Sequence, residues 1–273
     1  MSLYFKSICS SSGGNCLALW SEHTRILIDC GLSSMKRTRQ ALNSLFGEPL
    51  EIPLGIERKA KLDSVLLTHN HSDHISYYPL RVLEEYGHTI RLHEDCVTQL
   101  KEKHFNGYGF KNLNIQPFKN KEFKVGEFSI KPFEVNHNPY YPTYGFQITH
   151  QDKKIVIATD FNKWESVFDY FVDADFIFVE SNHDLELLQQ YYNPNSQFHM
   201  PNPQTGNLLF NIIECSKKSP STIMLGHISD QRNERDIARR ESASVFERAG
   251  KQMDFNLLTA PLKESSELIK IGC

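Results

Sequence analysis

The sequence predicts an α/β fold in which helices cover sheets. Short apolar and β-branched segments alternate with turn residues, as strands do, and segments of helical periodicity stand between groups of them. Because each element must bury its apolar face against another, this interleaving indicates helices packed on sheets. The expected strands are residues 3–8, 16–20, 25–29, 64–67, 121–124, 128–135, 144–149, 154–159, 176–179 and 222–225. The expected helices are residues 35–46, 75–86, 184–191, 205–217 and 234–249, with Gly47 and Pro49 ending the first of them.

The composition is that of a folded globular chain. Hydrophobic residues make up 40% of the 273 residues and aromatic residues 11%, which is enough for a sizeable core and argues against disorder. No internal repeat, low-complexity segment or linker divides the chain. We therefore expect a single domain spanning residues 1–273.

Charge and cysteine usage restrict the partners and the compartment. The net charge of −3 argues against a surface coated with basic residues, although a local basic patch remains compatible with it. The six cysteines form no C-x-x-C pair and no leader segment is evident, which favours a reducing, cytoplasmic setting. No apolar run approaches the roughly 20 residues that span a bilayer, so no membrane partner is expected. The oligomeric state is left open.

The stretch from Thr68 to His74 carries the strongest functional signal. Three of the twelve histidines and one aspartate fall within residues 69–74, directly after the apolar residues 64–67. Imidazole and carboxylate are ligands of zinc and other first-row divalent ions. Neither a regular strand nor a helix presents all four groups to one ion. We expect a turn at a strand end, with His69 and His71 facing one ion and Asp73 and His74 a second; the alternative is a polar loop that is rich in histidine by accident.

Three later strand ends supply further candidate ligands. His137 follows the strand 128–135, Asp160 follows 154–159 and His227 follows 222–225. Any one of them alone is an ordinary loop residue. Together with residues 69–74 they form an ordered set of ligands at four strand ends.

This ordered set resembles the metallo-β-lactamase fold superfamily. The resemblance implies a four-layer αββα sandwich, two mixed sheets flanked by helices, with a dinuclear site along one edge. It places His69, His71 and His137 on the first ion, Asp73, His74 and His227 on the second, and Asp160 between the two. Asp29 matches the first motif of the superfamily, an aspartate that orients the metal loop. The implied cofactors are two divalent ions, Zn²⁺ or Mn²⁺, with iron as a further option.

A narrower resemblance is to the YycJ/WalJ-like branch, regarded as phosphodiesterases with DNA exonuclease activity. It is carried by residues 10–16, 29–33, 180–184 and 226–229. The Gly-His-Leu-Ser-Asn element of that branch has its nearest match in Phe198-His199-Met200-Pro201-Asn202, which keeps the histidine and the asparagine. Phe161-Asn162 follows Asp160 where the branch usually has Thr-Gly.

Two ions bridged by Asp160 would share a water whose pKa falls far enough to give hydroxide near neutral pH, and this hydroxide would attack phosphorus. The leaving oxygen also needs a proton. His199 is the first candidate donor and His183 the second, since imidazole titrates in the working range; a structural or surface role is the alternative for both. The candidate catalytic residues are Asp73, His199 and His183.

Substrate contacts are expected from Asn15, Asn182 and Arg232. The turn 10–15 could offer backbone N–H groups to a phosphate, or it could be a plain hairpin turn. Asn182 could position the substrate. Arg232 could contact phosphate together with Arg235 and Arg239 on one helix face, or these arginines could lie on a solvated helix among interleaved acids.

The leading prediction is a metal-dependent hydrolase, specifically a phosphodiesterase or nuclease that acts on DNA in an exonuclease-like manner. The alternative is a metallohydrolase of a small molecule such as a cyclic phosphodiester, a thioester or a lactone, which the negative net charge mildly favours. A binding protein that has lost catalysis is the third possibility. The expected partner is accordingly nucleic acid, with DNA first, or a small phosphodiester.

Overall fold

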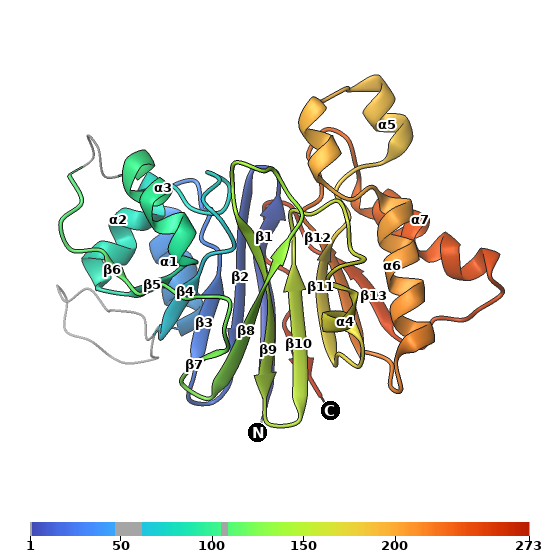
Figure 1. Ribbon diagram of the computed structural model, residues 1–273, viewed down its shortest axis with the longest axis horizontal. Coiled ribbons are helices and arrows are strands. Elements are labelled where there is room, and N and C mark those ends of the chain that lie inside the picture. Colours follow the sequence, from blue (N-terminus) through green and yellow to red (C-terminus); the bar gives the residue numbers. More distant parts are fainter. Residues whose placement is uncertain (1, 47–61, 105–108, 273) are drawn as a thin grey trace.

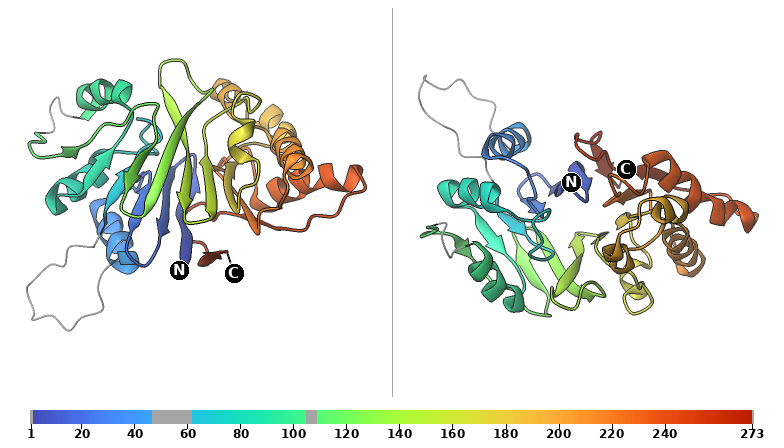
Figure 2. Two further views of the ribbon diagram at one scale, coloured as in Figure 1. Left: turned by 60° about the horizontal axis from the view of Figure 1, so that its bottom comes forward. Right: turned by 90° about the horizontal axis from the view of Figure 1, so that it is seen from above.

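A computed structural model describes residues 2–46, 62–104 and 109–272. Two seven-stranded sheets stack face to face, and helices cover the outer face of each (Figure 1). The view from above separates the two helical layers on either side of the sheets (Figure 2). The expected αββα sandwich is confirmed; that the whole chain is one domain stays a prediction.

The first sheet has the strand order β14-β1-β2-β3-β4-β5-β6. Neighbours from β14 to β3 are antiparallel, and neighbours from β3 to β6 are parallel. The strands are β1 (Leu3–Ser11), β2 (Gly14–Trp20), β3 (Arg25–Ile28), β4 (Ser64–Leu66), β5 (Thr89–Arg91), β6 (Asn114–Ile115) and β14 (Ile269–Ile271).

The second sheet has the order β13-β12-β11-β10-β9-β8-β7. Here β13 to β10 are parallel, and β10 to β7 are antiparallel, so both sheets are mixed. The strands are β7 (Phe123–Val125), β8 (Phe128–Val135), β9 (Thr143–His150), β10 (Lys153–Ala158), β11 (Phe176–Glu180), β12 (Thr222–Gly226) and β13 (Asn256–Thr259).

The helices fall into two outer layers and one projection. The first sheet is covered by α1 (Met35–Phe46), α2 (Tyr77–Tyr86) and α3 (Glu94–His104), and the second by α4 (Phe168–Phe171), α6 (Asn202–Cys215) and α7 (Arg235–Arg248). Helix α5 (Leu185–Gln190) and the 3₁₀ helix η1 (Pro194–Phe198) project beyond the upper edge of the sheets in Figure 1. Among the described residues, no helix is long and apolar enough to cross a membrane.

Strand β11 shows how the sequence builds these layers. Phe176 and Phe178 point into the core between the sheets, where Phe176 packs on Phe5 with ring centroids 4.6 Å apart. The alternate residues Ile177 and Val179 belong to the outer core under the helices. Because both faces of the strand are buried, its sequence is a continuous apolar run and not an alternating one.

Most expected elements are present, with small shifts at their ends. Helix α2 begins at Tyr77 and not at Ile75, because Ile75 instead forms a parallel bridge with Cys30 of the neighbouring strand end. Helix α6 begins at Asn202, three residues before the expected start. Gly47 and Pro49 lie outside the described residues.

The sequence analysis missed the strands β5, β6, β13 and β14, the helices α3 and α4, and the 3₁₀ helix η1. Strands β5 and β6 have only three and two residues, too few for a period to be recognised. Pairing with neighbours along the sheet edge, and not a local pattern, defines them.

Candidate metal centre

The candidate ligands emerge where strands leave the sheets. His69 follows β4, Asp160 follows β10 and His227 follows β12. Asp160 and His227 have left-handed backbones with φ of 60° and 50°, and Asp29 after β3 has the same conformation with φ of 60°. Asp and His are among the residues that tolerate this region best, at a typical cost of about 1–3 kcal/mol each. The chain thus turns sharply at each of these strand ends, next to the side chain that the site uses.

The ligand atoms gather into groups that match the predicted division. His69, His71 and His137 lie together with Asp160, and Asp73, His74 and His227 form a second group; within each group the ligand atoms lie within 4.8 Å of one another. A third group joins Asp160 and His227 to His199.

Asp160 lies between these groups. Its Oδ2 is 3.2 Å from Nε2 of His74, and its Oδ1 is 3.4 Å from Nε2 of His227 and 4.0 Å from Nε2 of His137. Asp160 is therefore placed to contact ions held by either of the two main groups, as the bridging prediction requires.

Two buried atoms at the centre lack a hydrogen-bond partner within the protein. Nε2 of His69 and Oδ2 of Asp160 have no hydrogen bond, although both residues are almost fully buried. A buried polar atom left unsatisfied costs about 1–3 kcal/mol. A metal ion coordinated by both atoms would satisfy them, so the donor set fits divalent ions.

Asp29 fixes the loop that carries the ligands. Its Oδ1 accepts the backbone N–H of Thr68 at 2.9 Å, and its Oδ2 accepts from Nδ1 of His74 at 2.7 Å. With Nδ1 of His74 engaged in this way, Nε2 faces Asp73 and Asp160. This geometry supports the orienting role predicted for Asp29.

Asn15 lies beneath the ligands and does not line the cavity onto which they open. Its backbone N–H donates to the Asp73 carbonyl at 2.7 Å, and its Nδ2 donates to Oδ2 of Asp73 at 3.3 Å. The residue is 3% exposed, at the end of the β1–β2 hairpin. The predicted substrate contact through Asn15 thus has no support in the geometry, whereas a role in holding Asp73 does.

Gly31 allows this close packing. A Cβ atom at Gly31 would lie 1.7 Å from the carbonyl oxygen of Asp73, well inside van der Waals contact. Its N–H also donates to the carbonyl of Asn15 at 2.8 Å. Only glycine lets the loop after β3 pass this close to the ligand loop.

Electrostatics divide the histidines of the metal-free cluster into two classes. Burial opposes a charge on His227, but Asp160, Asp73 and Glu180 raise its pKa to about 10. The pKa of His74 is likewise raised well above its usual value, despite burial, by the carboxylates around it. Burial lowers the pKa of His71 to about 4. The site thus offers a neutral imidazole at His71. At His74 and His227, a metal would have to displace protons.

Glu180 is a functional residue to which the sequence analysis assigned no role. It is fully buried at the end of β11, and its Oε2 is 3.1 Å from Nδ1 of His199 and 3.3 Å from Nδ1 of His227. Its Oε1 accepts the N–H groups of Phe161 and Met200. Despite burial, the two histidines lower its pKa to about 2. A carboxylate directly after a buried apolar strand is the signal that identified Asp160, and it would have identified Glu180 as well.

The ligands open onto a cavity of about 230 Å³, here called the metal cavity. Of the other predicted site residues, His199, Asn182 and Arg232 line it. Asn182 is also tied to the His227 carbonyl through its Nδ2 at 2.9 Å. His183 lies outside the metal cavity and lines an adjoining one.

The three arginines at positions 232, 235 and 239 do not point to one shared site. Arg232 precedes α7 and lines the metal cavity, and its buried Nε has no hydrogen-bond partner. Arg235 donates instead to the Thr259 carbonyl at 2.9 Å, on the edge strand β13. Arg239 lines a separate cavity beside that strand. Arg232 is thus the one member of this trio at the metal cavity.

Comparison with known proteins agrees with this geometry. Residues 24–228 match the family model described as a beta-lactamase superfamily domain. The chain is 26% identical to the exodeoxyribonuclease WalJ of Streptococcus pneumoniae, over 98% of this chain and 97% of that protein. It is also 26% identical to the exodeoxyribonuclease YycJ of Bacillus anthracis, over 92% of this chain and 91% of that protein.

The fold is shared with solved structures. The metallo-beta-lactamase fold protein YhfI from Bacillus subtilis superposes with a TM-score of 0.71 at 18% identity, covering 99% of this chain and 100% of that one. The family match spans most of the chain and includes every predicted metal ligand. The sandwich, the ligands at its strand ends and these matches together show that the chain belongs to the metallo-β-lactamase fold superfamily of hydrolases, in the YycJ/WalJ branch.

Proposed function

We propose that the chain is a phosphodiesterase that uses two divalent metal ions and acts on nucleic acid, with DNA as the expected substrate. The observation that carries the proposal is the convergence of two separate ligand groups on Asp160, beside a cavity that His199 also lines. The relatives named as exodeoxyribonucleases, matched over nearly their full length, support the choice of substrate.

The residues divide between the ions as the geometry suggests. His69, His71 and His137 would hold one ion, Asp73, His74 and His227 the other, and Asp160 would contact both. When bound, two such ions supply an activated water near neutral pH and stabilise negative charge on the phosphoryl group. Zn²⁺ and Mn²⁺ suit this set of imidazole and carboxylate ligands, with iron as a further option.

His199 is the proposed proton donor to the leaving oxygen. It lines the metal cavity, and the buried carboxylate of Glu180 contacts its Nδ1 at 3.1 Å. This contact holds the imidazole ring in place at the edge of the metal cavity. His183 ranks second, because it lies outside the metal cavity and because burial lowers its pKa to about 4, leaving it neutral at pH 7.

A small-molecule substrate is the second candidate function. The metal cavity measures about 230 Å³, and Arg232 is the one Lys or Arg among its described lining residues. A cyclic phosphodiester, a thioester or a lactone would need little more than this space.

The test measures metal content and substrate range on the same preparation. We expect about two divalent ions per chain and hydrolysis of both bis(p-nitrophenyl) phosphate and single-stranded DNA. His71→Ala and Asp73→Ala should each lower metal content and activity, whereas His23→Ala, at an exposed histidine of the β2–β3 turn, should change neither. A fully metal-loaded protein that cleaves no phosphodiester would overturn the proposal, and activity on thioesters or lactones alone would establish the second candidate.

A further inference from the structure

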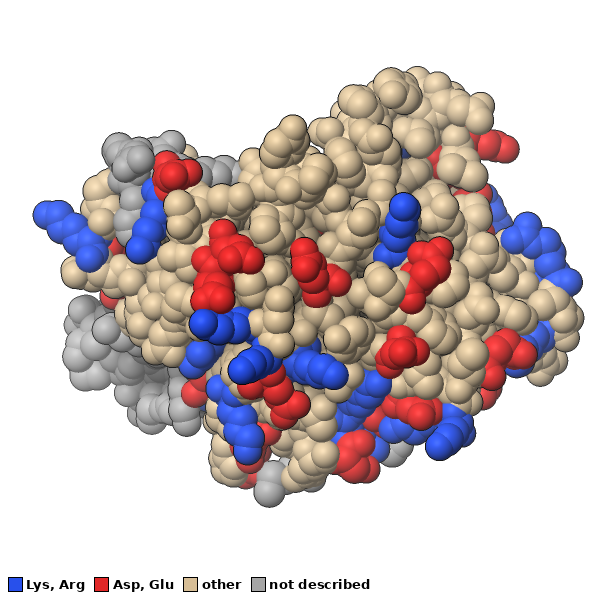
Figure 3. Space-filling view, viewed as in Figure 1, with Lys and Arg blue, Asp and Glu red and all other residues tan. Residues whose placement is uncertain are grey.

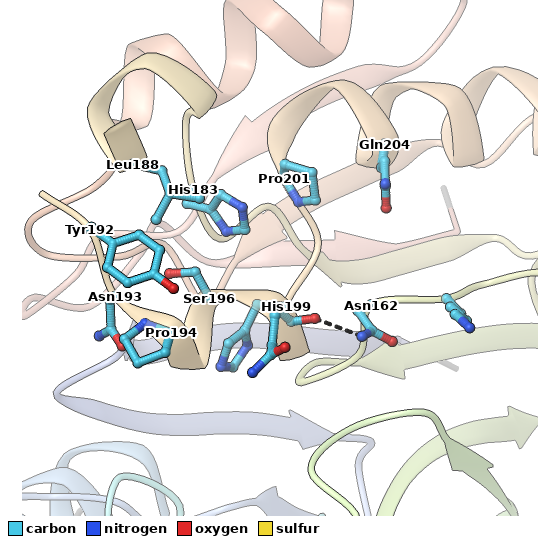
Figure 4. Close-up of a pocket in the computed structure, with 12 residues that line it drawn as sticks. Asn162, His183, Leu188, Tyr192, Asn193, Pro194, Ser196, His199, Pro201 and Gln204 are labelled. Carbon is cyan, nitrogen blue, oxygen red and sulfur yellow. Dashed lines mark hydrogen bonds between the residues drawn. The ribbon is translucent and has the colours of Figure 1, made fainter. Parts of the chain in front are cut away.

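A second cavity adjoins the metal cavity. It measures about 380 Å³, and Asn193, Ser196 and His199 line both cavities. The close-up shows Tyr192, Asn193 and Pro194 on one side of it, Asn162 and Gln204 on the other, and His199 between them (Figure 4). The candidate proton donor thus stands at the junction of the two spaces.

The lining of this cavity is unlike that of the metal cavity. Four side-chain amides and one cation, Lys163, contribute to it, and its described lining includes no carboxylate. We call it the amide pocket, after Asn162, Asn193, Gln197 and Gln204. Amides both donate and accept hydrogen bonds in one plane, as the edges of nucleobases require.

Asn162 is tied to the wall of the amide pocket. Its Nδ2 donates to the Gln197 carbonyl, and its Oδ1 is buried without a hydrogen-bond partner in the protein.

An aromatic side chain stands at the rim. Tyr192 lines the amide pocket and is 78% exposed, so its ring is accessible to a ligand. A base stacked on an aromatic ring is a sequence-tolerant contact in single-strand binding. The neighbouring Tyr191, 55% exposed, does not line either cavity and provides a matched comparison.

The volumes of the two cavities also favour a nucleoside as the ligand. Small-molecule pockets usually measure about 300–1,000 Å³, so the metal cavity alone is small, and a substrate whose phosphate sits there must extend beyond it. The amide pocket, at about 380 Å³, is at the lower end of that range and is suited to one nucleoside and not to a longer segment.

The surface charge of the α5 region does not favour binding of a long phosphate backbone. In the space-filling view, the Lys and Arg side chains on the visible face are scattered among Asp and Glu, mostly over its lower part, and the surface of the projecting α5 region is largely uncharged (Figure 3). Recognition around the amide pocket would then depend on stacking and hydrogen bonds more than on phosphate charge.

We propose that the amide pocket binds the nucleoside attached to the scissile phosphate, with its base stacked on Tyr192 and hydrogen-bonded to the amides. This rests on the proposed function and deepens it: the substrate is a nucleotide ester, recognised one nucleoside at a time. A site of this size next to the metal cavity fits cleavage that starts from a strand end.

The test compares substrates that share one leaving group and differ in whether they carry a nucleoside. The p-nitrophenyl esters of thymidine 5′- and 3′-monophosphate carry the nucleoside, and bis(p-nitrophenyl) phosphate does not. In the metal-loaded wild type we expect kcat/KM for one of the thymidine esters to exceed that for bis(p-nitrophenyl) phosphate by at least tenfold. Tyr192→Ala and Gln204→Ala should each reduce this preference about tenfold, whereas Tyr191→Ala should preserve it. No preference in the wild type, or equal effects of the two tyrosine variants, would overturn the inference.

A binding measurement separates this inference from the proposed function. Thymidine itself, which has no phosphate, is titrated into the metal-free protein and followed by ligand-observed NMR. Binding that Tyr192→Ala weakens about tenfold and Tyr191→Ala leaves unchanged would uphold the pocket even if no phosphodiester were cleaved. Absence of thymidine binding together with turnover of bis(p-nitrophenyl) phosphate would overturn the pocket and leave the phosphodiesterase in place.

Discussion

Asp160 is the residue on which the two ligand groups depend. Its carboxylate lies among His74, His137 and His227, and its Oδ2 has no hydrogen-bond partner. Asp160→Asn keeps the shape but removes the charge, so we expect the metal content to fall from about two ions to one or fewer and phosphodiester hydrolysis to fall at least a hundredfold. Metal analysis and a steady-state assay on one preparation measure both.

Asp173→Asn is the matched control for that variant. Asp173 also has a left-handed backbone, with φ of 59°, but its Oδ1 accepts the Lys217 N–H, away from the metal cavity. Full metal content and activity in Asp160→Asn would contradict the bridging role.

His227 makes metal affinity depend on pH. In the metal-free protein its pKa is raised to about 10, so between pH 6.5 and 8.5 it carries a proton that a metal has to displace. Metal affinity therefore rises with pH, and the Kd for the metal falls about tenfold per pH unit for each proton that is displaced. Competition titrations against a chromophoric chelator at pH 6.5, 7.5 and 8.5 measure the slope, after correction for the chelator's own protonation. A Kd independent of pH would show that these protons are absent.

His199 can be tested through the leaving group. DNA releases a poor leaving group that needs a proton, whereas p-nitrophenolate leaves without one. We expect His199→Ala to lower kcat on DNA by about 10²- to 10⁴-fold and to have a much smaller effect on bis(p-nitrophenyl) phosphate. Glu180→Gln should reproduce part of the loss on DNA, because the Glu180 carboxylate holds the His199 ring through Nδ1. Equal losses on both substrates would instead assign His199 to the metal ligands, with Asp160 and His227.

At the scale of elements, the loop after β3 supports the ligand loop. Gly31→Ala would force its Cβ against the carbonyl of Asp73, and backbone cannot move aside as cheaply as a flexible side chain. We expect the free energy of unfolding to fall by about 1–3 kcal/mol and metal affinity to fall as well. Denaturant titration of the metal-free protein and chelator competition provide the two measurements.

The control for that variant is Gly13→Ala in the adjacent β1–β2 turn. A Cβ there would meet its nearest neighbour, Oγ of Ser11, at 3.5 Å, an ordinary contact. Its stability and metal affinity should stay close to those of the wild type. If Gly31→Ala behaved in the same way, the close approach would not constrain the site.

At the scale of the whole molecule, charge limits how the protein holds nucleic acid. The net charge is −3, and each cavity has one Lys or Arg among its described lining residues, Arg232 or Lys163. Two phosphate contacts to a single strand give a slope of log Kd against log salt of about 1.4, shallow for a DNA-binding protein. Fluorescence anisotropy of a labelled single-stranded oligonucleotide between 50 and 300 mM salt tests this; a slope of 4 or more would reveal a basic tract that these cavities do not include.

The sequence by itself determined the fold class and the set of candidate metal ligands. Buried strands leave a periodic apolar pattern, and ligands placed directly after them remain visible as His and Asp in a conspicuous order, as in residues 69–74 and at His137, Asp160 and His227. These signals are local, so they can be identified without knowledge of contacts. The same reasoning failed for β5, β6 and β14, which owe their existence to pairing with neighbouring strands.

Only the tertiary structure decided how the residues around the ligands are used. The parallel register that pairs Ala158 with Val179 and Glu180 with Gly226 brings Glu180 between the strand ends that carry Asp160 and His227, where it meets His199. Packing against the ligand loop likewise placed Asn15 beneath Asp73, and the fold of residues 183–204 put His183 in the amide pocket. These positions depend on contacts between residues tens to hundreds of positions apart, and the pattern along the chain does not encode such contacts locally.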